Sequence, residues 1–424
     1  MRASWTAGDI DKKTQAALRH LPFADLSIIW IMQQPLRIAL LNRLDVRDVG
    51  TLSGATYFMI EALERKSVSV ASLGPIGSLW MKLGRYLNGA AQLAGCRYDW
   101  LHSIAGSREL GKKFAARLQN NHYDVIFAPL ASTEIAYLET SIPIVYLTDM
   151  TFALGKSYYR SFTNLLPFTE REGATIERRA IGKAAEVVAS SEWARRSFVD
   201  DYGCPPEHVH VVAFGANLDA PPSREEALQQ RDLQICRLLL LGVNWERKGG
   251  ALALGVLRAL TQLGIAAELL VCGCTPPAGV SHPSMTVLHF LRKDRPEEAR
   301  KLRRLLLTST FLILPSLADA APNVFAEASA CGLPSVTRNT GGIASVVRDG
   351  INGLCLPAEA GAAEYAARIG ELMRNRERYR SLCVSSRDEY EQRLNWDARA
   401  TRMVEIFSAA KGSAGHSAGR DGHA

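Results

Sequence analysis

The sequence lacks the paired cysteines that mark disulfide frameworks and zinc sites. Its 424 residues include eight cysteines, and the closest two, Cys272 and Cys274, do not form a CxxC pair. Eight cysteines in a chain of this length are too few for a disulfide scaffold. The composition therefore favours a reducing, cytoplasmic setting and argues against a zinc ribbon or a CxxC redox protein.

Long hydrophobic runs are also missing. The most apolar early stretch, residues 21–32, contains Asp25 and is shorter than the roughly 20 residues that a membrane-spanning helix needs. Charged residues come early, and no small-residue cleavage site follows an apolar core. We therefore expect neither a signal peptide nor a transmembrane helix.

Two nucleotide-binding fingerprints are absent. No GxGxxG follows a predicted strand, and no GxxxxGK[ST] is present, which argues against a dinucleotide-binding enzyme and a P-loop NTPase. The net charge of +7 is spread along the chain without a dense basic block and interleaved aromatics. Nucleic-acid binding is therefore not expected, and the cluster at 292–304 is interpreted as a solvated helix face.

What the sequence does contain is an alternation of short apolar runs and helix-length segments. Hydrophobic residues make up 47% of the chain, enough for full cores, and the length suggests two or three domains. Alternating strands and helices predict an α/β fold with parallel sheets covered on both faces. The predicted strands form two series, at 36–41, 68–73, 125–128, 144–147, 187–189 and 210–213, and then at 237–241, 268–272, 286–288, 311–314 and 335–337.

A Pro-Pro pair and a polar stretch at 217–226 separate the two series and resemble an interdomain connection. We expect two Rossmann-like domains, whose ligands bind beyond the carboxyl ends of the strands. The predicted division is an N-terminal extension (1–35), a first domain (36–219), a second domain (220–390), a C-terminal helix that crosses back to the first domain (391–410) and a disordered tail (411–424).

The most informative motif follows the strand predicted at 311–314. Asp319 and Glu327 bracket a loop and the start of a helix. Asn323 and Val324 would present backbone N–H groups at that helix N-terminus, which favours anions. Glu327, about one turn inside the helix, could accept paired hydrogen bonds from a sugar diol. An isolated pair of acids would be ordinary for a loop between a strand and a helix. Here further motifs follow in order up to residue 357, and this series favours a functional role for the pair.

This region resembles the family-4 glycosyltransferases, retaining enzymes of the GT-B fold. The resemblance rests on Phe-Ala-Glu-Ala-Ser-Ala-Cys-Gly-Leu-Pro (325–334), Thr-Gly-Gly (340–342) and Val-Val-Arg-Asp-Gly-Ile-Asn-Gly-Leu (346–354), and it extends over roughly residues 36–405. It implies two Rossmann-like domains whose sheets face each other across a cleft. It also implies that Glu327 binds the nucleotide ribose and Asp319 contacts the donor sugar. Asp319 stands where the family usually has Glu, and residues 320–322 replace its usual Gly-Phe-Gly.

A second motif, Gly242-Val-Asn-Trp-Glu-Arg-Lys-Gly-Gly, follows the strand predicted at 237–241. The resemblance places Lys248 on the donor diphosphate, while the family's usual Arg is here Val243. Arg247 is a candidate for the missing charge, and an orientation toward solvent is equally compatible with its position. A diphosphate leaving group needs fixed cations and N–H donors or a metal, and Lys248 with helix amides could serve without one.

In the first domain, the resemblance places Gly54 in a glycine loop near the donor diphosphate and the acceptor. Asp149 ends another strand and is a candidate contact to a hydroxyl of the donor sugar or the acceptor, with helix capping as the alternative. The only Asp-x-Asp match is Asp9-Ile-Asp11, before the first strand, and the histidines share no metal-ligand spacing. No metal and no other cofactor are expected.

The predicted function is transfer of a sugar from a UDP- or GDP-linked donor to a hydroxyl, with retained anomeric configuration. The predicted acceptor is a glycan or lipid-linked saccharide of bacterial surface polysaccharide or lipopolysaccharide synthesis, reached from the cytoplasm at the inner membrane face. Residues 21–32 could make that membrane contact or form a buried helix. The alternatives are a nucleotide-sugar epimerase, a non-catalytic GT-B protein that binds nucleotide sugar or glycan, and a two-domain solute-binding protein, which would need export.

Overall fold

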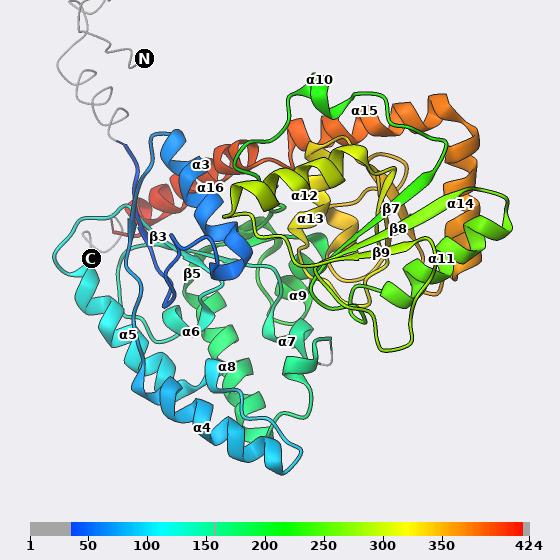
Figure 1. Ribbon diagram of the computed structural model, residues 1–424. Coiled ribbons are helices and arrows are strands. Elements are labelled where there is room, and N and C mark those ends of the chain that lie inside the picture. The colour runs from blue at the N-terminus through cyan, green and yellow to red at the C-terminus, as the bar shows by residue number, and fades with distance from the viewer. Residues whose placement is uncertain (1–34, 157, 419–424) are drawn as a thin grey trace, which may run out of the picture.

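The structure is a computed structural model that describes residues 35–156 and 158–418. Two parallel six-stranded sheets, each flanked by helices, form its two domains (Figure 1), so the predicted α/β class with two Rossmann-like sheets is confirmed. The first sheet has the strand order β2-β1-β3-β4-β5-β6. Its strands are β1 (Arg37–Leu40), β2 (Ser69–Ser72), β3 (Val125–Pro129), β4 (Ile144–Thr148), β5 (Ala184–Ala189) and β6 (Val209–Val211).

The second sheet has the order β12-β11-β10-β7-β8-β9. It begins at residue 236, so the Pro-Pro stretch lies between the two sheets. One of its strands, β12, was not predicted as a strand, because its glycine and loop motifs masked the short apolar run. The strands are β7 (Cys236–Leu241), β8 (Ala267–Cys272), β9 (Met285–Leu288), β10 (Phe311–Leu314), β11 (Ser335–Arg338) and β12 (Gly353–Leu356).

Alternating side chains along the strands of the first sheet fill two separate cores. Ala39 and Leu41 belong to the core beneath α5 (Ile104–Leu118) and α8 (Pro167–Lys183). Ile38 and Leu40 belong to the core beneath α3 (Ala55–Arg65) and the last helix, α16 (Trp396–Ala418). Both faces are buried because successive side chains point to opposite sides of a strand. The helices of this domain are α3 (Ala55–Arg65), α4 (Leu79–Leu93), α5 (Ile104–Leu118), α6 (Ser132–Ile135), α7 (Phe152–Gly155), α8 (Pro167–Lys183) and α9 (Glu192–Asp200).

The second domain has one continuous core of leucine-rich strands and helices. Its first strand, β7, is buried along nearly its whole length, as expected for a central parallel strand. The connecting helix α10 (Arg224–Ala227) precedes this sheet. The other helices are α11 (Gly250–Gln262), α12 (Pro296–Thr308), α13 (Asn323–Ala330), α14 (Ala362–Arg374) and α15 (Arg376–Gln392).

The last helix, α16 (Trp396–Ala418), lies on the first domain beside α3 (Figure 1). Trp396, Met403 and Phe407 pack into the first domain's core. The helix predicted from residue 391 is interrupted before Trp396, because Asn395 ends one helix and begins the next. Its side-chain amide donates to the carbonyls of Tyr390 and Glu391, and its oxygen accepts from Ala398 N–H.

The C-terminal segment differs from its predicted disorder. α16 extends to Ala418, since a helix already nucleated by packing gains one hydrogen bond per added residue and the segment holds no proline. Residues 21–32, for which a membrane contact or a buried helix was considered, lie outside the described residues. Within residues 35–156 and 158–418, no helix combines the length and the apolar character needed to cross a membrane.

Close packing of Gly215 against Trp396 joins the chain after β6 to α16 and yields a test. A Cβ at residue 215 would lie 2.8 Å from the backbone nitrogen and Cγ of Trp396, so Gly215→Ala must displace this contact. Overpacking of this kind costs about 1–3 kcal/mol, and we expect a lower thermal midpoint in differential scanning calorimetry. Gly182→Ala is the control, because nothing lies within 4 Å of its Cβ position; equal midpoints for the two variants would contradict the contact.

Candidate active site

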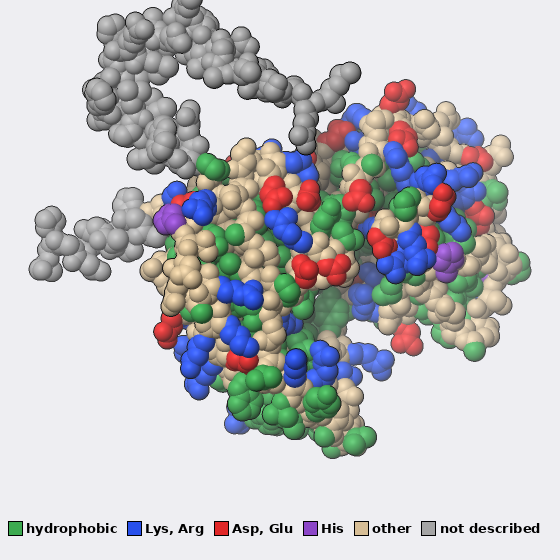
Figure 2. Space-filling view, turned by 60° about the vertical axis from the view of Figure 1, so that its left-hand side comes forward, with side chains coloured by type: hydrophobic (Ala, Val, Ile, Leu, Met, Phe, Trp, Pro, Cys, Tyr) green, Lys and Arg blue, Asp and Glu red, His purple; other side chains and the backbone are tan. Residues whose placement is uncertain are grey.

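The candidate site lies between the domains, where the predicted residues follow the carboxyl ends of strands. Asp149 follows β4, Lys248 follows β7, and Asp319 follows β10. Figure 2 shows a hollow between the two lobes of the molecule. Polar side chains at these strand ends can therefore meet across the space where ligands of parallel sheets bind.

Lys248 and Asp319 form a buried ion pair at the edge of the second sheet. Their Nζ and Oδ2 atoms are 2.5 Å apart, and the two residues are 8% and 7% exposed. The turn that carries Lys248 ends at Gly249, which has φ +74° and approaches Pro315 so closely that a Cβ would lie 2.1 Å from its carbonyl oxygen. This close approach brings the loops after β7 and β10 together.

Arg247 faces the same carboxylate rather than open solvent. Its guanidinium donates to the carbonyl of Ala318 at 2.9 Å and lies 3.5 Å from Asp319 Oδ2. Val243, at the position where the family usually has Arg, is exposed. Arg247 and Lys248 therefore provide two cations at one point of the cleft, and the single charge of Asp319 leaves one positive charge in excess there.

Glu327 is a second buried carboxylate with a lysine partner, and this partner was not predicted. Lys293 Nζ contacts Glu327 Oε1, and Glu327 is 4% exposed. The interpretation of residues 292–304 as a solvated helix face is wrong for Lys293, because this residue precedes α12 and its ammonium reaches into the cleft. A lysine in a loop belongs to no periodic sequence pattern, so Lys293 could be identified only from the three-dimensional structure.

The N-terminus of α13 lies between the two acids. Asn323 is its first residue, Val324 the second, and Pro322 at the cap position provides no side-chain hydrogen bond. The side-chain nitrogen of Asn323 is buried without a partner among the described residues. Uncapped amides at the positive end of a helix favour binding of an anion. This end of α13 directly follows the loop that carries Asp319.

Asp149 is not a helix cap, because the side chain of Thr151 caps α7 by accepting from Leu154 N–H at 3.3 Å. Burial, with a smaller contribution from the negative charge of Asp319, raises the pKa of Asp149 to about 6. The carboxylates of Asp149 and Asp319 therefore interact electrostatically although they belong to different domains. An acid with this pKa is partly protonated near neutral pH.

Gly54 is the N-cap residue of α3 and has φ +80°, a conformation that favours glycine. The preceding loop is held by Asn217, whose side-chain nitrogen donates to the carbonyl of Ser53 at 2.7 Å. Asn217 also accepts from Trp396 Nε1 at 3.0 Å, and its backbone carbonyl accepts from Lys293 Nζ at 3.1 Å. The glycine loop is thus connected to the lysine that pairs with Glu327.

Two tyrosines that were not predicted reach from the first domain to the loop of Asp319. Tyr158 and Tyr159 accept hydrogen bonds from the backbone N–H groups of Asp319 and Ala320, each at 2.9 Å. Burial and the Asp319 charge raise the pKa of both hydroxyls, so both stay protonated. Only the fold brings these two tyrosines to residues 315–322, the loop between β10 and α13 that carries Asp319 and that we call the donor loop.

The candidate site shows no metal-binding cluster. In the part of the chain that the structure describes, no three His, Cys, Asp or Glu side chains come together as metal ligands. The Asp9-Ile-Asp11 sequence lies outside the described residues. The cations that face the cleft are the side chains of Arg247, Lys248 and Lys293.

Two family models match consecutive parts of the chain. The Glycosyltransferase Family 4 model matches residues 58–220, and the Glycosyl transferases group 1 model matches residues 236–375. The boundary between the two matches falls between the two sheets. Lys248, Asp319 and Glu327 all lie in the second match.

The chain is similar to D-inositol 3-phosphate glycosyltransferase of Thermobispora bispora, with 24% identity over 250 residues that cover 55% of this chain. The match spans only 58% of that relative's length. Among solved structures, sucrose-phosphate synthase of Thermosynechococcus elongatus covers 90% of this chain and is itself fully covered, with a TM-score of 0.64 and 15% identity. Anabaena HepE in complex with UDP-glucose covers 88%, is fully covered too, and has a TM-score of 0.56 and 14% identity. These structures share the GT-B fold.

The raised pKa of Asp149 predicts a pH-dependent effect on stability. An unfolded Asp titrates near 3.9, so the fold binds this proton more tightly; the resulting stabilisation is complete below about pH 4 and is lost as the pH rises through about 6. Asp149→Asn, which cannot ionise, should raise the thermal midpoint over wild type at about pH 8 and lose this advantage at about pH 4. Exposed Asp219→Asn is the control, and a pH-independent effect of Asp149→Asn would contradict the assignment.

Proposed function

The chain belongs to glycosyltransferase family 4, and from this premise we propose that it transfers a sugar from a nucleoside-diphosphate sugar to an acceptor hydroxyl. The observation that carries the proposal is the pairing of Lys248 and Arg247 with Asp319 beside the uncapped N-terminus of α13. This arrangement supplies cations and N–H donors at one point of the cleft. A diphosphate leaving group requires that combination.

The diphosphate would bind by partner exchange. Its oxygens would take the contacts to Lys248 and Arg247 that Asp319 now holds, and the amides of Asn323 and Val324 would donate to the same group. Because these charges are fixed by the fold before the reaction, they stabilise the negative charge that develops as the glycosidic bond breaks. This scheme needs no metal ion, and we propose metal-independent transfer.

Glu327 would bind the ribose of the nucleotide. A carboxylate can accept two hydrogen bonds from neighbouring hydroxyls, and Glu327 already accepts a contact from Lys293. The ammonium of Lys293 would then lie close to the ribose and the diphosphate. The nucleotide is UDP or GDP in this proposal, and Glu327 suits either, since ribose is common to both.

Asp149 and Asp319 would surround the reacting sugar from the two domains. With a pKa near 6, Asp149 can accept a hydrogen bond from a sugar or acceptor hydroxyl and hold it in place. We propose retention by front-face substitution, in which the leaving phosphate takes the proton of the acceptor hydroxyl. The bond from the anomeric carbon to the phosphate oxygen breaks as the bond to the acceptor oxygen forms on the same face.

The proposed acceptor is a glycan or lipid-linked saccharide of bacterial surface polysaccharide synthesis, at the inner face of the cytoplasmic membrane. Support for the membrane contact comes from α4, whose outer face is apolar. Only Met81 and Gly84 of this helix are buried, while Tyr86 is 79% and Leu93 is 93% exposed. The other exposed apolar residues on it are Leu79, Trp80, Leu83 and Leu87.

Hydrophobic and basic side chains gather at the lower end of the first domain, where α4 lies (Figures 1 and 2). Lys82 and Arg85 are exposed on the same helix. An apolar helix face with flanking cations suits the interface of an anionic phospholipid membrane. We therefore propose α4 as the membrane-contacting element.

Two alternatives give different outcomes in one assay. A nucleotide-sugar epimerase would convert the donor without an acceptor, and a non-catalytic binding protein would leave it intact. A transferase consumes the donor in proportion to the acceptor supplied. Slow donor hydrolysis that is lost in Glu327→Ala would exclude the non-catalytic alternative.

Lys248→Ala tests the proposed catalysis. The donor is first identified from the nucleoside diphosphate that raises the thermal midpoint, since a ligand at 100 times its Kd stabilises by about 2.7 kcal/mol. With that donor, Lys248→Ala should lower kcat by about 10²–10³-fold, because one preorganised donor to the leaving group is lost. Lys66→Ala, at an exposed position, is the control. Turnover of Lys248→Ala near the wild-type rate would refute the role.

The double variant Trp80→Gln with Leu83→Gln tests the membrane contact by flotation with vesicles. Wild type should float with phosphatidylglycerol-containing vesicles more than with pure phosphatidylcholine, and the variant should bind about tenfold less. Leu263→Gln with Val287→Gln removes exposed apolar residues of the second domain and should float like wild type. Equal losses in both double variants would show that α4 is not the contact.

A further inference from the structure

A cavity of about 550 Å³ lies at the joint between the domains. Its lining comes from α9 and the end of β6 in the first domain, from the segment after β11 in the second, and from the junction of α15 and α16. The charged residues that line it are five arginines and one glutamate: Arg196, Arg348, Arg393, Arg399, Arg402 and Glu192. A cavity of this size can hold a small ligand.

Arg399 is a buried cation without a counterion. It is 1% exposed, and within the described residues no carboxylate pairs with it. Its Nη1 donates to the carbonyls of Val212 and Ala213, the latter at 2.7 Å, and its guanidinium lies over the rings of Phe214 and Trp396. Its Nε and Nη2 have no hydrogen-bond partner among the described residues. Burial lowers its pKa to about 9, so it remains charged at neutral pH. An uncompensated buried charge is costly unless an anion comes near.

The neighbouring arginines leave a positive excess around the cavity. Arg348 and Arg393 share one carboxylate, that of Glu389, and Arg402 pairs with Glu405 at the surface. Arg196 forms no ion pair with any carboxylate in the described ranges. Three guanidinium groups around this cavity therefore have no carboxylate to neutralise them among the described residues. They are those of Arg399, Arg196 and one of the two arginines that share Glu389.

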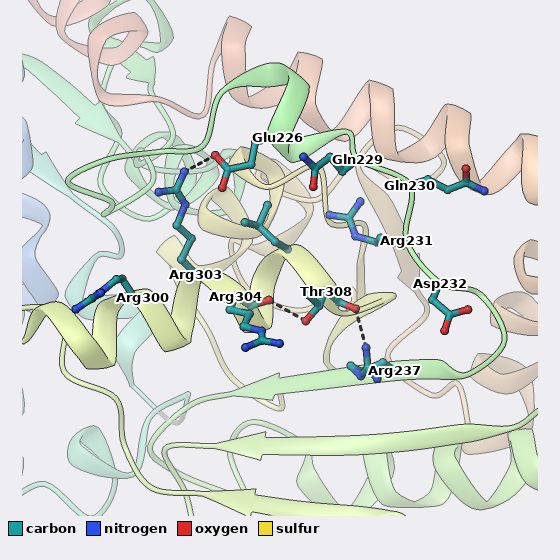
Figure 3. A pocket seen from close by; sticks show the side chains of 11 residues that line it. Glu226, Gln229, Gln230, Arg231, Asp232, Arg237, Arg300, Arg303, Arg304 and Thr308 are labelled. Carbon is teal, nitrogen blue, oxygen red and sulfur yellow. Dashed lines mark hydrogen bonds and ion pairs between the residues drawn. The ribbon is translucent and has the colours of Figure 1, made fainter.

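A second arginine-rich cavity, of about 460 Å³, provides a contrast (Figure 3). It lies at the opposite end of the second sheet, near Arg237 and the end of α12. Three of its five arginines are paired, Arg303 with Glu226, Arg300 with Glu297 and Arg237 with Glu268. Arg231 and Arg304 form no ion pair among the described residues, and Arg231 donates instead to the carbonyl of Cys331. Both cavities therefore contain arginines without a counterion, and the cavity at the joint differs in the depth of its unpaired arginine: Arg399 is 1% exposed and has two unpartnered nitrogens, whereas Arg231 is 8% exposed and has one.

We propose that the cavity at the joint binds a small phosphate-bearing anion that bridges the two domains. Guanidinium groups form paired hydrogen bonds with phosphate oxygens. Arg196 would contribute from the first domain, Arg348 from the second, and Arg402 from α16. The bound anion would also offset the charge of Arg399 beneath them.

The site is positioned to influence the donor loop. Ser345 lines the cavity and its Oγ accepts from Glu192 N–H at 2.9 Å, which joins the domains. Three residues earlier, Gly342 N–H donates to the carbonyl of Asp319 at 3.1 Å. An anion that holds Ser345 and α9 together would therefore favour one arrangement of the segment that contacts Asp319.

Isothermal titration of the full chain with inorganic phosphate and with pyrophosphate, at constant ionic strength, tests the proposal. The titrations use the Lys248→Ala background, which weakens the candidate donor site. We expect one bound anion, with affinity at least about tenfold weaker after Arg196→Gln with Arg402→Gln, because two phosphate contacts are removed. Arg300→Gln with Arg304→Gln, in the cavity of Figure 3, is the matched control and should leave the affinity unchanged.

Absence of binding at millimolar phosphate and pyrophosphate in the Lys248→Ala background would overturn the proposal. Equal weakening by both arginine pairs would overturn it too, since it would indicate general attraction to positive charge. Both arginine pairs lie on exposed helix positions or at the surface, and circular dichroism would verify that each variant is folded. Because phosphate binding is measured directly, the result is independent of whether the chain transfers a sugar.

Discussion

Two buried carboxylates, each paired with a lysine, determine how the cleft is built. An unpaired carboxylate at this depth would be strongly destabilising, so Asp319 and Glu327 require cations that reach them from other loops. Lys248 comes from the loop after β7, and Lys293 comes from the segment before α12. These pairs fix three segments of the second domain against one another without any ligand. Ligand recognition at such a site means replacing existing partners, so affinity reflects the difference between the new contacts and the old ones.

The same pairs connect the second domain to the first through Asn217. This residue is 2% exposed and bonds to the Ser53 carbonyl, the Trp396 indole and the Lys293 ammonium. Tyr158 and Tyr159 make a second connection, to the backbone of the donor loop. A change at Glu327 or Asp319 is therefore transmitted directly to residues of the first domain. The arrangement gives the two halves of the site a shared set of hydrogen bonds instead of independent surfaces.

Local patterns predicted most of the fold. Apolar runs and turn residues identified eleven of the twelve strands, because buried parallel strands are continuous hydrophobic segments. The strand β12 and the break at Asn395 were not predicted, since glycine-rich motifs and a single capping side chain decide them. In the site, Lys248, Asp319 and Glu327 stand in motifs of fixed spacing and could be located. Lys293, Tyr158 and Tyr159 lie in loops without periodicity, and only tertiary contacts bring them to the cleft.

The chain passes between the domains twice, after β6 and again between α15 and α16. The two passages lie side by side, since Ala216 N–H donates to the carbonyl of Leu394 at 3.0 Å and Gly215 packs against Trp396. Because the two crossings are adjacent, they define a single hinge axis between the domains. Relative motion is then restricted to rotation about that axis, while sliding and twisting would break the bond between the crossings. A rotation about this axis would change the width of the cleft while the hydrogen bond between Ala216 and Leu394 and the contact between Gly215 and Trp396 stay in place.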